Sequence, residues 1–193
     1  MKKTLLGGLI CLASSVVSSA AWANWSIDNE FSRVSFVSVK NEVVGEAHHF
    51  TQIKGNLTKS GDFSIEIPLA SVETMIPIRN ERMQKMLFET NKFATAMLTG
   101  KVNPKDLKIP LGVSKFIKVD ADLGLHGVNA LINIEAMVTK VAKDKLQVVS
   151  IKPIIINPAT FGLDKGVEKL QAVAGLNNIT QSVPVSFVLT FKL

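Results

Sequence analysis

The sequence predicts an all-β protein, in which the chain forms an eight-stranded antiparallel barrel with two short helices. Three observations lead to this prediction. Apolar and polar residues alternate with a period of two in about eight segments, turn residues separate most of these segments, and only two segments show helical spacing. Strands joined by short turns pair as hairpins, so we expect a mainly antiparallel sheet. A barrel of this size is just wide enough to hold one small ligand.

The first 23 residues are typical of a secretory signal peptide rather than of the barrel. Met1-Lys2-Lys3 is a positively charged start, residues 5–17 are an apolar run, and Ala21-Trp22-Ala23 is an A-x-A cleavage pattern. We therefore expect cleavage after Ala23, export to the periplasm, and a barrel domain over residues 24–193.

Removal of this peptide also constrains the chemistry of the mature chain. It takes away Lys2, Lys3 and Cys11, which is the only cysteine, and lowers the formal net charge from +6 to +4. A chain without a thiol has no disulfide scaffold, cysteine nucleophile or thiolate metal site. The modest positive charge does not approach the basic stripe of a nucleic-acid-binding protein.

The alternating segments follow one another along the whole predicted domain. In chain order they are residues 25–39, 47–57, 62–69, 93–102, 117–125, 130–141, 146–156 and 183–191. Turn residues at 59–61, 103–106, 126–127 and 143–145 separate several of them.

Two segments depart from this alternation and predict helices. Residues 79–89 carry Met83, Met86 and Leu87 at helical spacing, and residues 164–174 carry Val167, Leu170 and Val173 likewise, with Gly175 as a plausible helix stop.

Several stretches, taken in order, resemble the YceI family of exported, lipocalin-like proteins that are often called polyisoprenoid-binding. The first strand resembles that family in Trp25-Ser26-Ile27-Asp28, and the second in Gly45, Phe50, Ile53 and Gly55. The most specific run is Ala70-Ser71-Val72-Glu73-Thr74 followed by Arg79-Asn80-Glu81-Arg82-Met83, Leu87-Phe88-Glu89 and Lys92-Phe93. Later matches are Leu125-His126-Gly127-Val128, Phe161-Gly162-Leu163 and the strand 183–189. The resemblance implies a lipocalin-like barrel around an elongated apolar cavity that accepts an isoprenoid or another lipid tail.

A group of flexible apolar residues around the first helix is the candidate wall for such a tail, because methionine adapts to irregular shapes. The candidates are Phe36, Phe50, Met83, Met86, Leu87, Phe88, Phe93 and Met97. The alternative interpretation is that the helix simply plugs one barrel end with ordinary core residues.

Candidates for a polar head contact are His48, His49, Arg79 and Arg82. Neighbouring residues on a strand point to opposite faces, so His48 and His49 cannot hold one metal ion together, and we predict no metal site and no cofactor. An arginine offers paired N–H donors to an anionic head, whereas the alternative is a solvated helical face with local ion pairs.

No catalytic motif with a recognisable spacing occurs, so we expect a binding protein rather than an enzyme. The favoured function is a periplasmic carrier that sequesters an isoprenoid or other lipid-like molecule, with transient contact to an anionic membrane surface. The alternative is a secreted interaction or stress-response protein whose barrel is filled by its own side chains.

Overall fold

The computed structural model describes residues 24–193, and the predicted signal peptide lies outside the described residues. The strands are β1 (Trp25–Ile27), β2 (Arg33–Lys40), β3 (Val44–Phe50), β4 (Lys54–Leu57), β5 (Asp62–Pro68), β6 (Val72–Glu73), β7 (Thr95–Lys101), β8 (Ser114–Leu125), β9 (Val128–Ala142), β10 (Lys145–Ser150), β11 (Ile154–Ile156) and β12 (Val183–Lys192). The α-helices are α1 (Pro77–Arg82) and α2 (Asp164–Val173). Short 3₁₀ turns occupy Asn29–Phe31, Leu69–Ser71, Pro104–Asp106 and Pro158–Phe161.

Eight of these strands form a closed antiparallel ring in the order β1-β4-β5-β7-β8-β9-β10-β12. The ring closes because β1 pairs with β4 on one side and with β12 on the other. β2 pairs with the first half of β12 and continues through β3 to β6, so these three strands extend away from the ring. The predicted antiparallel barrel with two short helices is confirmed.

Two of the predicted strands are each broken at a corner of the barrel. The 3₁₀ turn Asn29–Phe31 separates β1 from β2, and residues 51–53 separate β3 from β4. Asn29 joins the two corners, because its side chain accepts a hydrogen bond from Ile53 N (2.7 Å) and donates one to Thr51 O (3.0 Å). The apolar positions change parity at each corner, from Trp25 and Ile27 to Val34 and Phe36 at the first and from Phe50 to Ile53 and Leu57 at the second. The prediction treated each pair of short strands as one alternating segment and did not use this change. The segment predicted over 146–156 is likewise divided, into β10 and β11.

The first helix begins two residues before the predicted start at Arg79, and it changes from an α-helix to a π-helix along its length. Pro77 is well suited to the first turn of α1, where a backbone N–H has no intrahelical partner. The chain then continues as a π-helix over Met83–Leu87, in which Phe88 N donates to Met83 O at 2.9 Å. Such π-turns often occur at functional sites.

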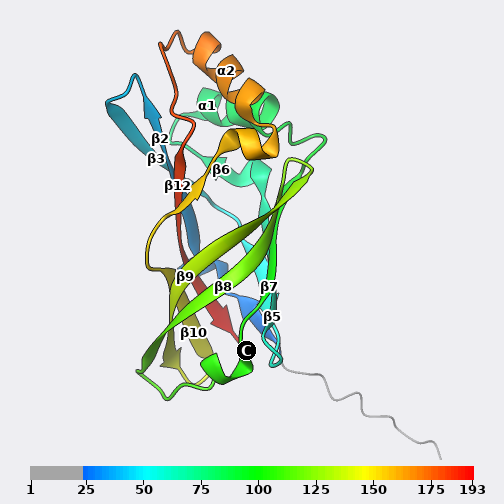
Figure 1. Cartoon of the computed structure of the whole chain (residues 1–193), viewed down its shortest axis with the longest axis vertical. Coiled ribbons are helices and arrows are strands. Elements are labelled where there is room, and N and C mark those ends of the chain that lie inside the picture. Colours follow the sequence, from blue (N-terminus) through cyan, green and yellow to red (C-terminus); the bar gives the residue numbers. More distant parts are fainter. Residues whose placement is uncertain (1–23) are drawn as a thin grey trace, which may run out of the picture.

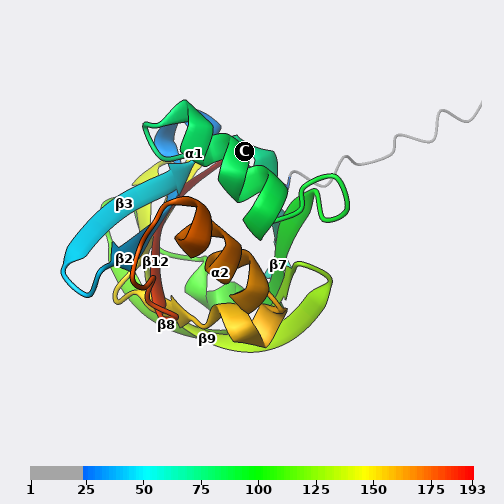
Figure 2. The ribbon, with the colours of Figure 1, turned by 90° about the horizontal axis from the view of Figure 1, so that it is seen from above.

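The second helix ends where the sequence predicted. Gly175 has a positive φ of 62°, Gly175 N donates to Ala172 O, and Leu176 N donates to Gln171 O. This pattern is a Schellman motif, which satisfies the last carbonyl groups of the helix. Both helices lie over the same end of the barrel, opposite the end at which the chain terminates (Figure 1), and they lie side by side when seen from above (Figure 2).

Side chains fill the end of the barrel that lies away from the helices, which we call the filled half. Leu146 is completely buried there. It belongs to a core cluster that includes Trp25, Leu57, Val138 and Phe191. Within residues 24–193, none of the helices is long and apolar enough to cross a membrane.

Candidate ligand-binding site

A cavity of about 440 Å³ occupies the barrel beneath the helices, and we call this part of the molecule the hollow half. Its volume lies within the range of roughly 300–1,000 Å³ that is typical of ligand pockets. On β12 the side chains from Val183 to Leu189 that face inward line the cavity, whereas Phe191 lies in the filled core. At about 3.3 Å per residue this stretch is about 20 Å long. It therefore exceeds half the roughly 30 Å hydrocarbon thickness of a bilayer.

The cavity reaches solvent at the helix end. Lining residues there include Ile76 and Ile78 at the start of α1 and Val173 at the end of α2, and all three are exposed. We call this opening the mouth. Lys40 and Ile179, which form an isolated β-bridge, also line the cavity.

Five of the eight residues predicted as an apolar wall line the cavity. They are Phe36 and Phe50 from β2 and β3, and Met83, Leu87 and Phe88 from the π-helix and the residue after it. The rings of Phe36 and Phe50 are 5.5 Å apart, and those of Phe50 and Phe88 are 6.1 Å apart. Tilted aromatic pairs at such distances are favourable, so the wall has a continuous aromatic stripe.

The other three predicted wall residues, Met86, Phe93 and Met97, do not line the cavity. On β7 the inward side chains are those of Ala96 and Leu98, so Met97 between them points outward, where Ser64 donates a hydrogen bond to its sulfur. Ala96, Met97 and Leu98 are all apolar, so the sequence pattern did not show which face of this strand points inward.

The side chains of Phe93 and Met86 are kept away from the cavity by their local surroundings. Phe93 packs against His126 as a tilted ring pair with centroids 4.2 Å apart, and it lies against Gly127. Met83 and Leu87 of the π-helix and Phe88 after it line the cavity, whereas Met86 does not.

Sequence reasoning missed the part of the wall that α2 and the strands opposite it supply. Leu163, which precedes α2, and Val167 and Leu170 on the helix line the cavity, and Leu123 and Leu125 line it from β8. The helical spacing of Val167 and Leu170 was visible in the sequence. It marked a buried face without indicating that this face covers a cavity.

The wall becomes polar toward the mouth. On β2 and β3 the register joins Val34 to Phe50, Phe36 to His48 and Ser38 to Glu46. Because these side chains line the cavity, an apolar surface deep in the barrel gives way to Ser38, His48 and Glu46 near its opening.

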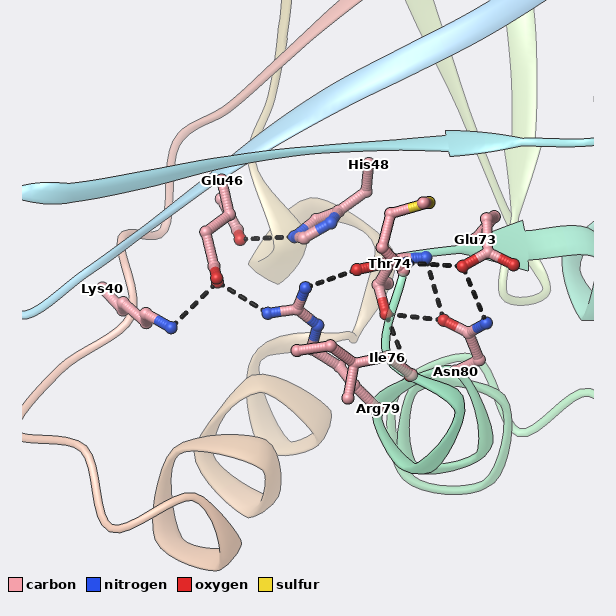
Figure 3. Close-up of polar contacts among 10 residues, drawn as sticks. Lys40, Glu46, His48, Glu73, Thr74, Ile76, Arg79 and Asn80 are labelled. Atoms are coloured by element: carbon pink, nitrogen blue, oxygen red, sulfur yellow. Dashed lines mark hydrogen bonds and ion pairs between the residues drawn. The ribbon is translucent and has the colours of Figure 1, made fainter.

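A cluster of hydrogen bonds connects this polar surface to α1 (Figure 3). Glu46 Oε2 accepts from Arg79 Nη1 at 2.7 Å and pairs with Lys40 Nζ at 3.0 Å. Arg79 Nη2 donates to Thr74 O at 2.6 Å, and Ser38 Oγ lies 3.0 Å from His48 Nε2. Strand β3 and helix α1 are therefore held together by charged groups at the cavity surface.

The charge state of this cluster follows from its surroundings. Burial lowers the pKa of the His48 imidazole, and the nearby Arg79 cation lowers it further, so His48 is neutral at pH 7. Partial burial raises the pKa of the Glu46 carboxyl, but hydrogen bonds from Arg79 and Lys40 outweigh this effect. The pKa of Glu46 is therefore below its usual value and the group is ionised at pH 7.

A second network supports Arg79 from the outer side of the cavity. The side-chain oxygen of Asn80 accepts from Thr74 N (2.9 Å) and from Thr74 Oγ1 (2.6 Å), and its amide nitrogen donates to Glu73 (3.2 Å). Hydrogen bonds from Asn80 and from Met75 N lower the pKa of the Glu73 carboxyl. This network fixes the Thr74 carbonyl that receives the Arg79 bond.

The remaining polar candidates occupy two different positions. Arg82 lines the cavity and, within residues 24–193, has no ion-pair partner. His49 does not line the cavity; it lies opposite Glu73 in the β3–β6 register.

No group of three or more histidine, cysteine, aspartate or glutamate residues in the part of the chain that the structure describes is arranged to hold a metal ion. His126 lies outside the cavity lining, and its ring nitrogens contact Phe161 O and Glu89.

The comparisons with known proteins agree with this architecture. The YceI-like domain family matches residues 25–191 of the chain. The chain belongs to the YceI-like family.

Solved structures support the same assignment. A polyisoprenoid-binding domain from Saccharophagus degradans, implicated in plant cell wall breakdown, is 34% identical with a TM-score of 0.85, and the match covers 87% of this chain and 97% of that one. Burkholderia cenocepacia BcnA shares the fold at 17% identity and a TM-score of 0.67, over 85% of this chain and 98% of that one. The Campylobacter jejuni YCEI protein does so at 15% identity and a TM-score of 0.55, over 76% and 84%. Among curated proteins nothing matches.

Proposed function

We propose that this YceI-like protein is a periplasmic carrier that holds the tail of an isoprenoid or a similar lipid in its hollow half. The observation that carries the proposal is the long apolar cavity with a single polar side near its mouth. The S. degradans relative at 34% identity is described as a polyisoprenoid-binding domain, which supports the same class of ligand here. The proposal requires no bond to be made or broken.

The polarity of the cavity wall supports one direction for the proposed ligand. The tail contacts Phe36, Phe50 and Phe88 in the interior, whereas the head lies near His48, Arg79 and Arg82. The opposite direction would bury a polar head among apolar side chains, which costs free energy without compensating hydrogen bonds.

The energetics favour a long tail over a small metabolite. Burial of one methylene is worth about 0.8 kcal/mol, so ten methylenes contribute roughly 8 kcal/mol before the costs of association. A ligand that extends along most of the roughly 20 Å stretch of β12 has enough apolar surface to offset those costs.

Native mass spectrometry of the mature protein, purified gently from its own periplasm, tests the proposal. We expect a stoichiometric mass excess of several hundred daltons, released on denaturation as one lipid class. A bare protein that also takes up no isoprenoid quinone or prenyl phosphate when these are offered would contradict the proposal. That result would favour an interaction protein that acts through its surface.

A matched pair of variants on β7 shows whether the cavity holds the ligand. Ala96→Phe adds a ring that points into the cavity, whereas Thr99→Phe adds the same ring at an exposed position of the same strand. We expect the first variant to lose the bound mass and the second to keep it, with thermal unfolding showing that both are folded. Equal loss or equal retention in the two variants would argue against binding in this cavity.

A further inference from the structure

Two buried nitrogen atoms at the cavity have no hydrogen-bond partner. Within residues 24–193, His48 Nδ1 and Arg79 Nε are the only buried side-chain nitrogen or oxygen atoms that lack one. Both residues line the cavity, and His48 is only 3% exposed. Buried polar groups in proteins are nearly always hydrogen-bonded, so two exceptions at one site call for an explanation.

Both unpaired atoms are best described as hydrogen-bond donors. Arg79 Nε always carries a hydrogen. Neutral His48 has one N–H, and the Ser38 hydroxyl beside Nε2 decides its position. If Ser38 donates to Nε2, only the Nδ1 hydrogen lacks a partner. If His48 Nε2 instead donates to Ser38, the Ser38 hydrogen and the Nδ1 lone pair both lack a partner, because within residues 24–193 the Ser38 hydroxyl contacts no other hydrogen-bonding group.

The two residues face each other across the polar side of the cavity. Figure 3 shows the His48 ring on the strand side and the Arg79 guanidinium reaching toward it from α1. The other two nitrogens of Arg79 are occupied by Glu46 and by Thr74 O. The His48 ring also lies 5.2 Å from the ring of Phe36, so His48 is located where the apolar wall begins.

We propose that His48 and Arg79 form a subsite for an oxygen atom of the ligand's head group, which accepts hydrogen bonds from the two unpaired N–H groups. The proposal rests on the proposed function and adds the chemistry of the head. An alcohol, a carbonyl group and a phosphate share the acceptor oxygen that the subsite requires. A ligand made only of hydrocarbon, or one with a cationic amine head, leaves both donors unpaired.

Arg82 provides a way to distinguish a phosphate head group from a neutral alcohol or carbonyl head group. It lines the cavity as a third cation beside Lys40 and Arg79, against the one carboxylate of Glu46. A phosphate oxygen gains from this uncompensated charge, whereas a neutral alcohol or carbonyl oxygen gains little. Arg82→Gln is therefore expected to weaken binding of a prenyl phosphate and to leave binding of the matching prenyl alcohol unchanged.

The test uses the whole mature protein and three probes with one prenyl tail, namely the alcohol, the phosphate and the hydrocarbon without a head. His48→Phe keeps an aromatic ring beside Phe36 and removes the donor. We expect it to weaken binding of the alcohol and of the phosphate about fivefold, which corresponds to one hydrogen bond, and to leave the hydrocarbon unaffected. His48→Gln restores a donor and should recover part of the loss. His49→Phe, on a residue outside the cavity lining, is the matched control and should change nothing.

Stability measurements separate this role from a structural one. His48→Phe removes the hydrogen bond with Ser38, but it also removes the unpaired buried nitrogen and keeps a ring beside Phe36, so its unfolding temperature should stay close to that of the parent protein. If the variant is less stable and loses all three probes equally, His48 is a structural residue and the subsite is wrong.

The probes also separate failure of this inference from failure of the proposed function. Equal binding of all three probes, unchanged by His48→Phe, would overturn the subsite and leave the lipid carrier in place. Absence of any binding to the parent protein, with Ala96→Phe indistinguishable from it, would overturn both.

Discussion

The filled half and the hollow half of the barrel are built from the same alternating strands but are closed in different ways. In the filled half β1 completes the ring by pairing with β4 and β12, and side chains such as Leu146 and Phe191 meet in the middle. In the hollow half β2, β3 and β6 leave the ring, and the two helices cover the opening.

The difference shows how one strand pattern can produce both a core and a binding site. A ring of paired strands brings inward side chains close enough to fill the space between them. In the hollow half the helices α1 and α2, rather than further paired strands, cover the end of the barrel, and the space beneath them is a cavity. We therefore expect the filled half to supply most of the stability and the hollow half to supply the ligand contacts.

Truncation of the filled half should have the largest effect. Leu146 is 0% exposed, and its replacement by alanine removes packed methyl groups that no solvent or ligand can replace. We expect Leu146→Ala to lower the free energy of unfolding by about 3 kcal/mol or more, measured by urea denaturation. A loss below about 1 kcal/mol would mean that this half is not the tightly packed core that the comparison requires.

The contact between the helices should be the next most sensitive feature. A Cβ atom built on Gly166 of α2 would lie 2.8 Å from Met86 O and 2.9 Å from Leu87 Cα, both backbone atoms of the π-helix region. Alanine normally stabilises a helix by about 1 kcal/mol relative to glycine, but here we expect Gly166→Ala to destabilise the protein by roughly 2 kcal/mol. Lys165→Ala, at an exposed neighbouring position, is the control and should have little effect. A more stable Gly166→Ala variant would show that the two helices are not in fixed contact.

A matched truncation in the hollow half sharpens the contrast with Leu146. Leu98 lines the cavity from β7 and already borders empty space. Because fewer packing contacts are lost there, Leu98→Ala should cost only about 1 kcal/mol in the same urea experiment. Equal losses for Leu98→Ala and Leu146→Ala would erase the distinction between the halves.

The sequence predicted the barrel well because alternation and turns are local signals. The corners at 28–32 and 51–53 were missed because each pair of short strands was treated as one segment, although the apolar positions change parity at both corners. The sequence predicted that His48 and His49 point to opposite faces, but which of the two lines the cavity depends on register with β2. The outward position of Met97 was missed for another reason, because Ala96, Met97 and Leu98 are all apolar and leave the inward face of β7 undefined.

The hydrogen-bond partners within the polar cluster could not be predicted from the sequence. Arg79 was a candidate for a head contact, yet its partner Glu46 is 33 residues away and belongs to a strand whose register no local pattern sets. The unpaired state of His48 Nδ1 depends on Ser38 and on the burial of the whole site. Such properties arise only when separate elements are packed together.

The smallest expected effect concerns the ion cluster that joins β3 to α1 in the hollow half. Burial raises the pKa of Glu46, but hydrogen bonds from Arg79 and Lys40 lower it below the usual value near 4.5. A carboxyl whose folded pKa is depressed stabilises the protein above its unfolded pKa, and this contribution is lost as the pH falls through the folded pKa. The Glu46 contribution should therefore be complete at pH 7 and should disappear below about pH 4.5.

We expect Glu46→Gln to cost about 1 kcal/mol at pH 7, since the groups are partly exposed, and to cost progressively less as the pH is lowered to 3. Urea unfolding of both proteins across this pH range measures the difference, and a cost independent of pH would show that the Glu46 charge does not stabilise the helix-covered end.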